Sequence, residues 1–194
     1  MIADVMIFLK NRLNAHFSSL SGIGSNDAGE DKVVFVDGDQ KPDSISFKLG
    51  SVSLLLFNIE RDVTLRQADN YVRIADDGKS RRVNPDITLN LYVLFVAKFK
   101  DYEQSLHNIS QILRYFQANP YFDLQNAPDL GKTINHLTVE LDPLSTTKQN
   151  ELWGILRSSY VPSIVYKVKA VTFIDDGQIP IADISEVILN KEQL

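Results

Sequence analysis

The chain has 194 residues, of which 44% are hydrophobic and 23% are charged, and its formal net charge is −5. This size predicts one domain, with a hydrophobic core large enough to stabilise the fold without covalent cross-links. The absence of cysteine excludes disulfides, thiolate metal ligands and cysteine nucleophiles, and the mild acidic balance argues against generic nucleic-acid binding, which requires a basic face.

The N-terminal segment is predicted to be an amphipathic helix. Its apolar residues recur at three- and four-residue steps: Ile2, Val5, Leu9, Leu13, Phe17 and Leu20. Ile7 and Phe8 fall outside this stripe, so either the helix is buried deeply in the core or this second side contacts another subunit. The segment lacks the positive region and cleavage site of a signal peptide, and no window approaches the roughly 18 apolar residues of a membrane span. We therefore expect a protein that is cytoplasmic at synthesis and assembly.

A β-hairpin is predicted over residues 44–60, with Gly50-Ser51 as a two-residue turn. This register sets Phe47 opposite Leu54 and places alternate residues of both strands on one face. The second strand is apolar on its other face as well, so we expect it inside the sheet and not at an edge.

Residues 66–86 are rich in charge and poor in apolar side chains. Loops of this length are uncommon in compact domains unless they are functional or disordered. Asp77-Gly78 is a good turn pair for a small hairpin within the loop. The cations are either solvated or bind carboxylates on a partner protein, as a docking arm would. These cations are Arg66, Arg73, Lys79, Arg81 and Arg82.

A strand over residues 87–99 is predicted to be central, because both of its faces are apolar and require cover, normally by helices. The helix that follows begins at Asp101, with Gln104 in capping-box order, and ends at Asn119-Pro120. Its buried stripe is predicted to comprise Tyr102, Leu106, Ile109, Leu113 and Phe116.

The last third of the chain predicts a strand at residues 136–141, a helix that starts near Pro143–Thr146 and a long strand over residues 163–174. The helix is expected to be anchored by Leu152, Trp153, Ile155 and Leu156. We therefore expect an α/β or α+β domain over residues 1–174, with a single mixed, largely antiparallel sheet flanked by about three helices. Residues 175–194 are expected to form a C-terminal extension without an assigned structure.

The sequence contains no pattern typical of catalysis or cofactor binding. The histidines at positions 16, 107 and 136 have no partner at metal-binding spacing. Paired aspartates all lie beside glycine, as turn residues do, and neither a glycine-rich phosphate loop nor a nucleophile elbow is present. We expect no enzyme activity, no cofactor and no metal.

Four stretches together resemble one family. They are "IADVMIFLKNRLN", "SVSLLLFNIERDVTLR", "LYVLFVAKFKDYEQSL" with "LRYFQANPYF", and "LTVELDPLSTTKQNELWGILRSSYVPSIVYKV". The family is the N-terminal-domain family of the cap, or tail-terminator, proteins of phage-tail-like contractile injection systems. The resemblance extends over about residues 2–174, and the pairing of "NPYF" with the stretch around "YVPSIVYKV" is its most specific part.

The resemblance implies a structural protein that forms a ring, typically of six copies, on the distal end of an inner tube and its contractile sheath. Such a cap stops polymerisation and joins the two layers. Its expected partners are further copies of itself and the sheath and tube proteins. Neither nucleic acid nor a membrane is an expected partner. The particle is either released or anchored. The family supplies no catalytic residues.

Two alternatives remain at this point: a neck or baseplate adaptor of the same particle, and a small hydrolase or ligand-binding domain with scattered carboxylates. For the ring contact, Ile7, Phe8 and an edge strand are candidates. The tail "IPIADISEVIL" is a candidate to add a strand to a partner's sheet.

Overall fold

The computed structural model describes residues 2–21, 31–36, 45–62, 72–74, 80–82, 87–130, 134, 136–173 and 179–180. The helices are α1 (Ile2–Ser21), α2 (Tyr102–Ala118) and α3 (Thr146–Leu156), with a short 3-10 turn, η1 (Pro128–Leu130). The longer strands are β2 (Ser51–Arg61), β5 (Ile87–Lys98), β7 (His136–Leu141) and β8 (Ser163–Phe173). The short strands are β1 (Val33–Phe35), β3 (Val72–Ile74), β4 (Ser80–Arg82), β6 (Tyr121–Asp123) and β9 (Ile179–Pro180).

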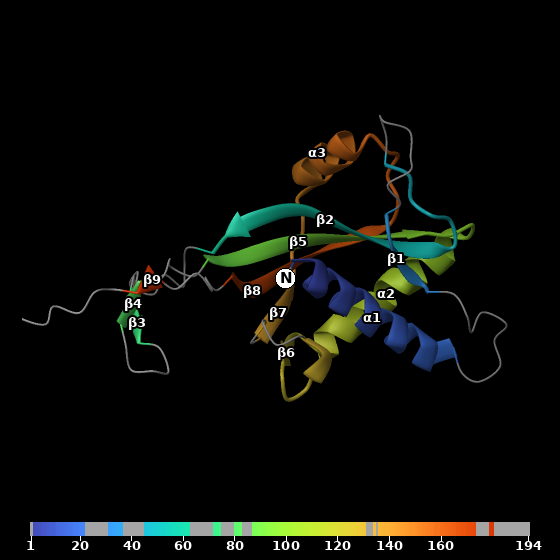
Figure 1. Ribbon diagram of the computed structural model, residues 1–194. Helices are drawn as coiled ribbons and strands as arrows, with labels where there is room; N and C mark the ends of the chain where they lie inside the picture. Colours follow the sequence, from blue (N-terminus) through green and yellow to red (C-terminus); the bar gives the residue numbers. More distant parts are fainter. Residues whose placement is uncertain are drawn as a thin grey trace, which may run out of the picture.

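Six of these strands form one mixed sheet, in the order β1-β2-β5-β8-β7-β6 (Figure 1). Neighbouring strands are antiparallel except for β1 and β2, which run parallel. α1 and α2 lie on one face of the sheet, and α3 lies on the other. This arrangement confirms the predicted fold class, a mixed and largely antiparallel sheet flanked by three helices.

β5 is the central strand that its two apolar faces predict. Leu91, Val93 and Phe95 belong to the larger hydrophobic core, on the side of α1 and α2. Leu94 and Val96 belong to a smaller core on the side of α3. Because successive side chains of a strand point to opposite faces, this one strand contributes to both cores.

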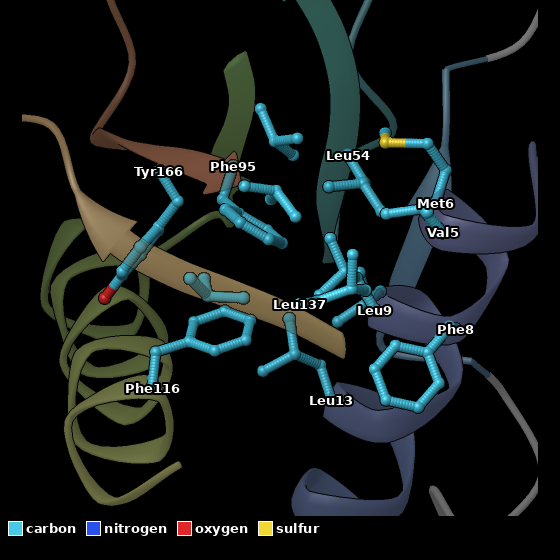
Figure 2. Packing of buried hydrophobic residues seen from close by; sticks show 14 of the residues in the cluster. Val5, Met6, Phe8, Leu9, Leu13, Leu54, Phe95, Phe116, Leu137 and Tyr166 are labelled. Carbon is cyan, nitrogen blue, oxygen red and sulfur yellow. The ribbon is translucent and has the colours of Figure 1, made fainter. Parts of the chain in front are cut away.

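Three aromatic rings lie at the centre of the larger core (Figure 2). The ring centroids of Phe116 and Tyr166 are 4.8 Å apart, and Phe95 lies 5.9 Å from each of them. Tilted and edge-on rings at such distances attract each other beyond the area that they bury. Burial raises the pKa of Tyr166 to about 12.

The prediction of a hairpin over residues 44–60 is wrong. Residues 45–48 form no strand, and on that side β2 pairs with β1 in a parallel register. A turn does form, but one residue earlier than predicted, at Leu49-Gly50, where Gly50 has a φ of +83° and Ser51 is already the first residue of β2. β2 nevertheless lies inside the sheet as predicted, between β1 and β5.

The residues before this turn pack on the face opposite to the one that a hairpin requires. Phe47 is buried against Trp153 of α3, with ring centroids 5.8 Å apart. The N–H of Ile45 donates to the carbonyl of Leu156, at the end of the same helix. A hairpin would instead place Phe47 with Leu54, on the side of α1. Tertiary packing against α3 therefore overrides the local alternation pattern.

α2 has the predicted extent but buries a different stripe. Its buried residues are Ser105, Asn108, Ile112 and Phe116. Tyr102 is 63% exposed and Leu106 is also exposed, so the predicted stripe is wrong for its first turns. Ser105 tolerates burial because its Oγ accepts a hydrogen bond from the N–H of Phe99 at 3.3 Å. Asn108 does so because its Nδ2 donates to the carbonyl of Gln104 at 2.7 Å.

The helix starts differ from the predictions in two details. Asp101 precedes α2 as the N-cap, but its side chain makes no capping hydrogen bond, so the predicted capping box is absent. Ser145 caps α3, where its Oγ accepts from the N–H of Lys148 at 3.4 Å. Three of the four predicted anchors of α3 are buried, whereas Ile155 is 79% exposed and is not an anchor.

β3, β4 and β9 form a second sheet, at the left of Figure 1. β3 and β4 are antiparallel, as predicted for a small hairpin in the charged loop; the turn at Asp77-Gly78 lies outside the described residues. β9 comes from the C-terminal region and pairs antiparallel with β4. The expected single sheet is therefore accompanied by a smaller three-stranded sheet.

Candidate interaction surfaces

The structure places three of the five predicted docking cations on the three-stranded sheet. Arg73 lies in β3, and Arg81 and Arg82 lie in β4. Arg66 and Lys79 lie outside the described residues. Arg73 and Arg81 are direct cross-strand partners.

The C-terminal strand β9 joins the same sheet. Ile179 is paired with Arg82, and Pro180 is paired with Arg81. Ile179 and Pro180 are the first two residues of the tail that is a candidate to add a strand to a partner's sheet. In the structure they pair within their own chain, and the rest of that tail lies outside the described residues. β4 and β9 are therefore paired, although they lie far apart in the sequence.

The two α1 residues predicted to contact another subunit lie in different environments. Ile7 is exposed, with Ala3 and Asn11, one turn away on either side, also exposed. Phe8 is only 3% exposed and points into the core (Figure 2). Its ring lies edge-on to Phe122, with centroids 5.1 Å apart. Phe8 is a core residue, which corrects its assignment to an outer apolar side of the helix.

The three histidines occupy separate places in the fold. His16 packs against Tyr115 with ring centroids 4.9 Å apart, His107 is exposed on α2, and His136 stacks on Tyr121. In the described part of the chain, no group of three or more histidines and carboxylates could hold a metal ion. Nor is any helix of that part long and apolar enough to cross a membrane.

A pocket of about 150 Å³ lies between α3, the start of β8 and the loop after β7. Its lining combines apolar residues, among them Leu141, Leu152 and Trp153, with the polar Gln149 and Ser163. Asp142 supplies the one carboxylate among the lining residues, and no histidine lines the pocket. This composition does not supply a pair of acid and base groups.

Sequence reasoning missed a cluster of lysines where β2 begins and β5 ends. The cluster comprises Lys32, Lys48, Lys98 and Lys100, from three segments of the chain. Backbone contacts bring the segments together: the carbonyl of Lys98 accepts from Gly50 at 2.7 Å, and the carbonyl of Lys32 accepts from Val52 at 2.8 Å. The Oγ of Ser51 donates to the carbonyl of Lys48 at 3.0 Å. We call this cluster, with Leu49 and Tyr102, the lysine end.

The lysine end combines positive charge with exposed apolar side chains. Leu49 is 53% exposed beside the turn, and Tyr102 projects from the first turn of α2. Within the described residues, Lys48, Lys98 and Lys100 form no ion pair. Apolar anchors with a polar rim are the usual composition of a protein interface. The sequence alone could not reveal this cluster, because its members become neighbours only when β1, β2 and β5 pair.

Two solved structures are similar to this chain. One is a PVC sheath/tube terminator of an extracellular contractile injection system in the extended state, with a TM-score of 0.60 and 19% identity over 100% of this chain and 65% of that chain. The other is an anti-feeding prophage tube-terminating cap, with a TM-score of 0.42 and 18% identity over 71% of this chain and 48% of that chain. The chain thus spans less than two thirds of the length of either structure. No curated protein matches the chain.

The match to a protein family covers almost the whole chain. The family described as the Pvc16 N-terminal domain matches residues 4–182. The match begins in α1 and ends just beyond β9, so it includes both sheets and all three helices. This confirms the resemblance found in the sequence: the chain belongs to the Pvc16 N-terminal domain family.

Proposed function

We propose that this protein is the structural cap of a phage-tail-like contractile injection system. It forms a ring, a hexamer, at the end of the inner tube and the contractile sheath. There it ends the polymerisation of both layers and holds them together. Its partners are further copies of itself and the sheath and tube proteins, with no nucleic acid or membrane.

The observation that carries this proposal is the family match over residues 4–182. The likeness of the fold to a sheath/tube terminator supports it. We propose that residues 1–174 form the terminator domain and that residues 175–194 extend it, with β9 joining the charged loop. We also propose that the protein assembles in the cytoplasm into a particle that is released or anchored.

The physics of the fold is compatible with a role at the end of a polymer. A terminator has to present one face to the last ring and none that recruits a further ring. Both edge strands of the six-stranded sheet, β1 and β6, are only three residues long. Short edge strands limit pairing with strands of other chains, so the sheet itself is a poor template for continued growth.

We propose that the role involves no catalysis. The apolar residues of the sheet and helices build two cores, and the pocket beside α3 offers a single carboxylate. The work of the molecule is then done by its surfaces. The docking arm is proposed to be the three-stranded sheet, where Arg73, Arg81 and Arg82 bind carboxylates of the sheath or tube.

Electron microscopy of particles that carry a gold label on this protein tests the proposal. Label is expected only at the end away from the baseplate, and deletion of the protein is expected to give tubes and sheaths of irregular length. Label at the baseplate or along the neck would instead identify an adaptor of the same particle. Particles of normal length and composition without the protein would rule out a terminating role.

A further inference from the structure

We propose that the lysine end is a docking surface for the last ring of the inner tube. There its lysines bind carboxylates of the tube protein, and Leu49 and Tyr102 pack against the same protein. This inference rests on the proposed function and deepens it, because it names the surface that meets one of the two layers. It starts from charges that have no partner within the chain.

The lysine end holds cations that the described chain leaves unpaired. Within the described residues, Lys48, Lys98 and Lys100 form no ion pair. Asp101 and Glu103 lie at the start of α2, where the positive end of the helix dipole stabilises negative charge. The four positive charges of the cluster and these two negative ones leave +2, whereas the whole chain carries −5. A basic surface on an acidic protein favours association with an acidic partner.

Two further carboxylates lie nearby and leave this charge in place. Asp31 is already paired with Lys10, at 2.9 Å. The N–H of Asp142 donates to the carbonyl of Val165, which pairs with β5 four residues before Lys98. Asp142 is therefore about 13 Å from that lysine along the strand direction. The positive charge of the lysine end remains available to another molecule.

Two large side chains are exposed among these lysines. Leu49 is exposed at the turn before β2, and Tyr102 is exposed at the first residue of α2. Protein interfaces combine such groups with a polar rim, and tyrosine is enriched among the residues that contribute most to binding. A ligand recognised by charge alone would not require them. The combination indicates a protein partner that offers carboxylates around an apolar centre.

Strand pairing holds the lysine end in place before any partner binds. The carbonyl of Lys98 accepts from the N–H of Gly50 at 2.7 Å, and the carbonyl of Lys32 accepts from the N–H of Val52 at 2.8 Å. A surface that is already ordered loses less entropy on binding. Such a fixed array suits a partner whose own surface keeps its shape. In a contractile injection system that partner is the inner tube, because the sheath is the layer that contracts.

The lysine end and the docking arm lie at opposite ends of β5 (Figure 1). From Ile87 to Lys98 the strand rises about 36 Å. Arg82, the last residue of β4, precedes Ile87 by five residues, and five residues of extended chain span at most about 18 Å. Arg82 therefore cannot reach the lysine end. Two separate basic surfaces allow one copy of the cap to bind two layers at once.

Sedimentation with tubes assembled from the purified tube protein tests the proposal. The wild-type protein should sediment with the tubes, and Lys48→Glu with Lys100→Glu should lower the bound fraction at least fivefold. The matched control is Arg114→Glu with Lys148→Glu on α2 and α3, which changes the net charge equally and should bind as the wild type does. Raising the salt concentration should release the wild-type protein, because salt screens exposed charges.

The apolar anchor and the docking arm are tested in the same assay. Tyr102→Ala should lower the bound fraction several-fold, and Tyr102→Phe should retain it. Ile155→Ala, at an exposed apolar position on α3, is the matched control and should leave binding unchanged. Arg81→Glu with Arg82→Glu should still sediment with tubes, because the arm is a separate surface. Thermal unfolding of each variant checks that the fold is kept.

Unchanged binding of the lysine-end variant to tubes would overturn the contact, and so would a wild-type protein that does not sediment with them. A variant that keeps tube binding but loses binding to purified sheath subunits would assign the surface to the sheath instead. A variant that keeps tube binding but no longer self-associates would assign the surface to the ring contact. Either result contradicts the proposal.

The gold-label experiment separates this contact from the cap function. If the label lies at the end away from the baseplate but tube binding does not depend on the lysine end, the cap function stands and the contact fails. If the label lies at the baseplate but tube binding requires the lysine end, the contact stands and the cap function fails.

Discussion

The side-chain amide of Asn14, on α1, satisfies both backbone groups of Val33 on the outer side of the edge strand β1. Its Nδ2 donates to the carbonyl of Val33 at 2.9 Å, and its Oδ1 accepts from the N–H of Val33 at 2.7 Å. The amide thus takes the place of a further strand. An edge whose hydrogen-bonding groups are occupied in this way is closed to pairing at that residue.

Replacing Asn14 with alanine should lower the free energy of unfolding by about 1–3 kcal/mol, because the N–H and carbonyl of Val33 lose their partner in a half-buried position. Urea unfolding measures the change. Asn11→Ala is the matched control: Asn11 is exposed on the same helix and makes no hydrogen bond in the described part of the chain. Equal stability of the two variants would show that the Asn14 pairing is not a stabilising contact.

Truncation of Phe95 tests the aromatic centre of the larger core. Phe95→Ala should cost about 3–5 kcal/mol of unfolding free energy, because it leaves a cavity beside the rings of Phe116 and Tyr166. Ile155→Ala should cost less than about 0.5 kcal/mol, since Ile155 is mostly exposed. Chemical unfolding of both variants distinguishes the two positions; a large loss for Ile155→Ala would contradict the orientation of α3.

His16 should make stability depend on pH. It packs against Tyr115 with its Nε2 buried and without a hydrogen-bond partner in the described structure, and burial lowers its pKa from the model-peptide value of 6.5. The unfolded state therefore takes up a proton more readily than the folded state. The contribution to stability is complete above about pH 6.5 and is lost as the pH falls below it.

Unfolding in urea across this pH range measures the effect. His16→Phe keeps a ring against Tyr115 and should flatten the decrease in stability between neutral and mildly acidic pH. His107→Phe, at an exposed position on α2, should leave the wild-type decrease in place. If His16→Phe shows the same pH profile as the wild-type protein, another group is responsible.

Charge reversal on the three-stranded sheet tests the docking arm. Arg81→Glu with Arg82→Glu should reduce the amount of this protein in purified particles several-fold and broaden their length distribution. The physical reason is that β4 would then repel the carboxylates that it is proposed to bind. The matched control is Arg114→Glu with Lys148→Glu, two exposed cations on α2 and α3. Particles of unchanged composition and length from the arm variant would contradict the docking role.

Local sequence patterns were sufficient to predict most of the helices and strands. The two-sided apolar run of β5 predicts a central strand between helices, and the three- and four-residue spacing of Val5, Leu9 and Leu13 predicts the buried face of α1. The small hairpin of β3 and β4 also follows from local turn chemistry. The charged loop could be singled out from its length and composition, although its partner strand β9 could not.

The predictions that failed depend on where a residue packs and not on its type. Phe47 alternates correctly for a hairpin, yet it is buried against Trp153 on the other face. Tyr102 continues the apolar stripe of α2, yet Ser105 takes the buried place because its hydroxyl is satisfied locally. Which residue is buried in these cases depends on contacts with segments far away in the chain. The periodicity of one segment carries no information about those contacts.

What the sequence by itself determined is the set of helices and long strands, the family and the lack of cysteine chemistry, because periodicity, composition and characteristic stretches are local properties. Only the tertiary structure decided that β1 pairs parallel to β2, that β9 joins the charged hairpin and that four lysines meet at one end of the sheet. These are contacts between segments far apart in the chain. Their formation depends on chain closure and on competing packing partners, and no single segment encodes either.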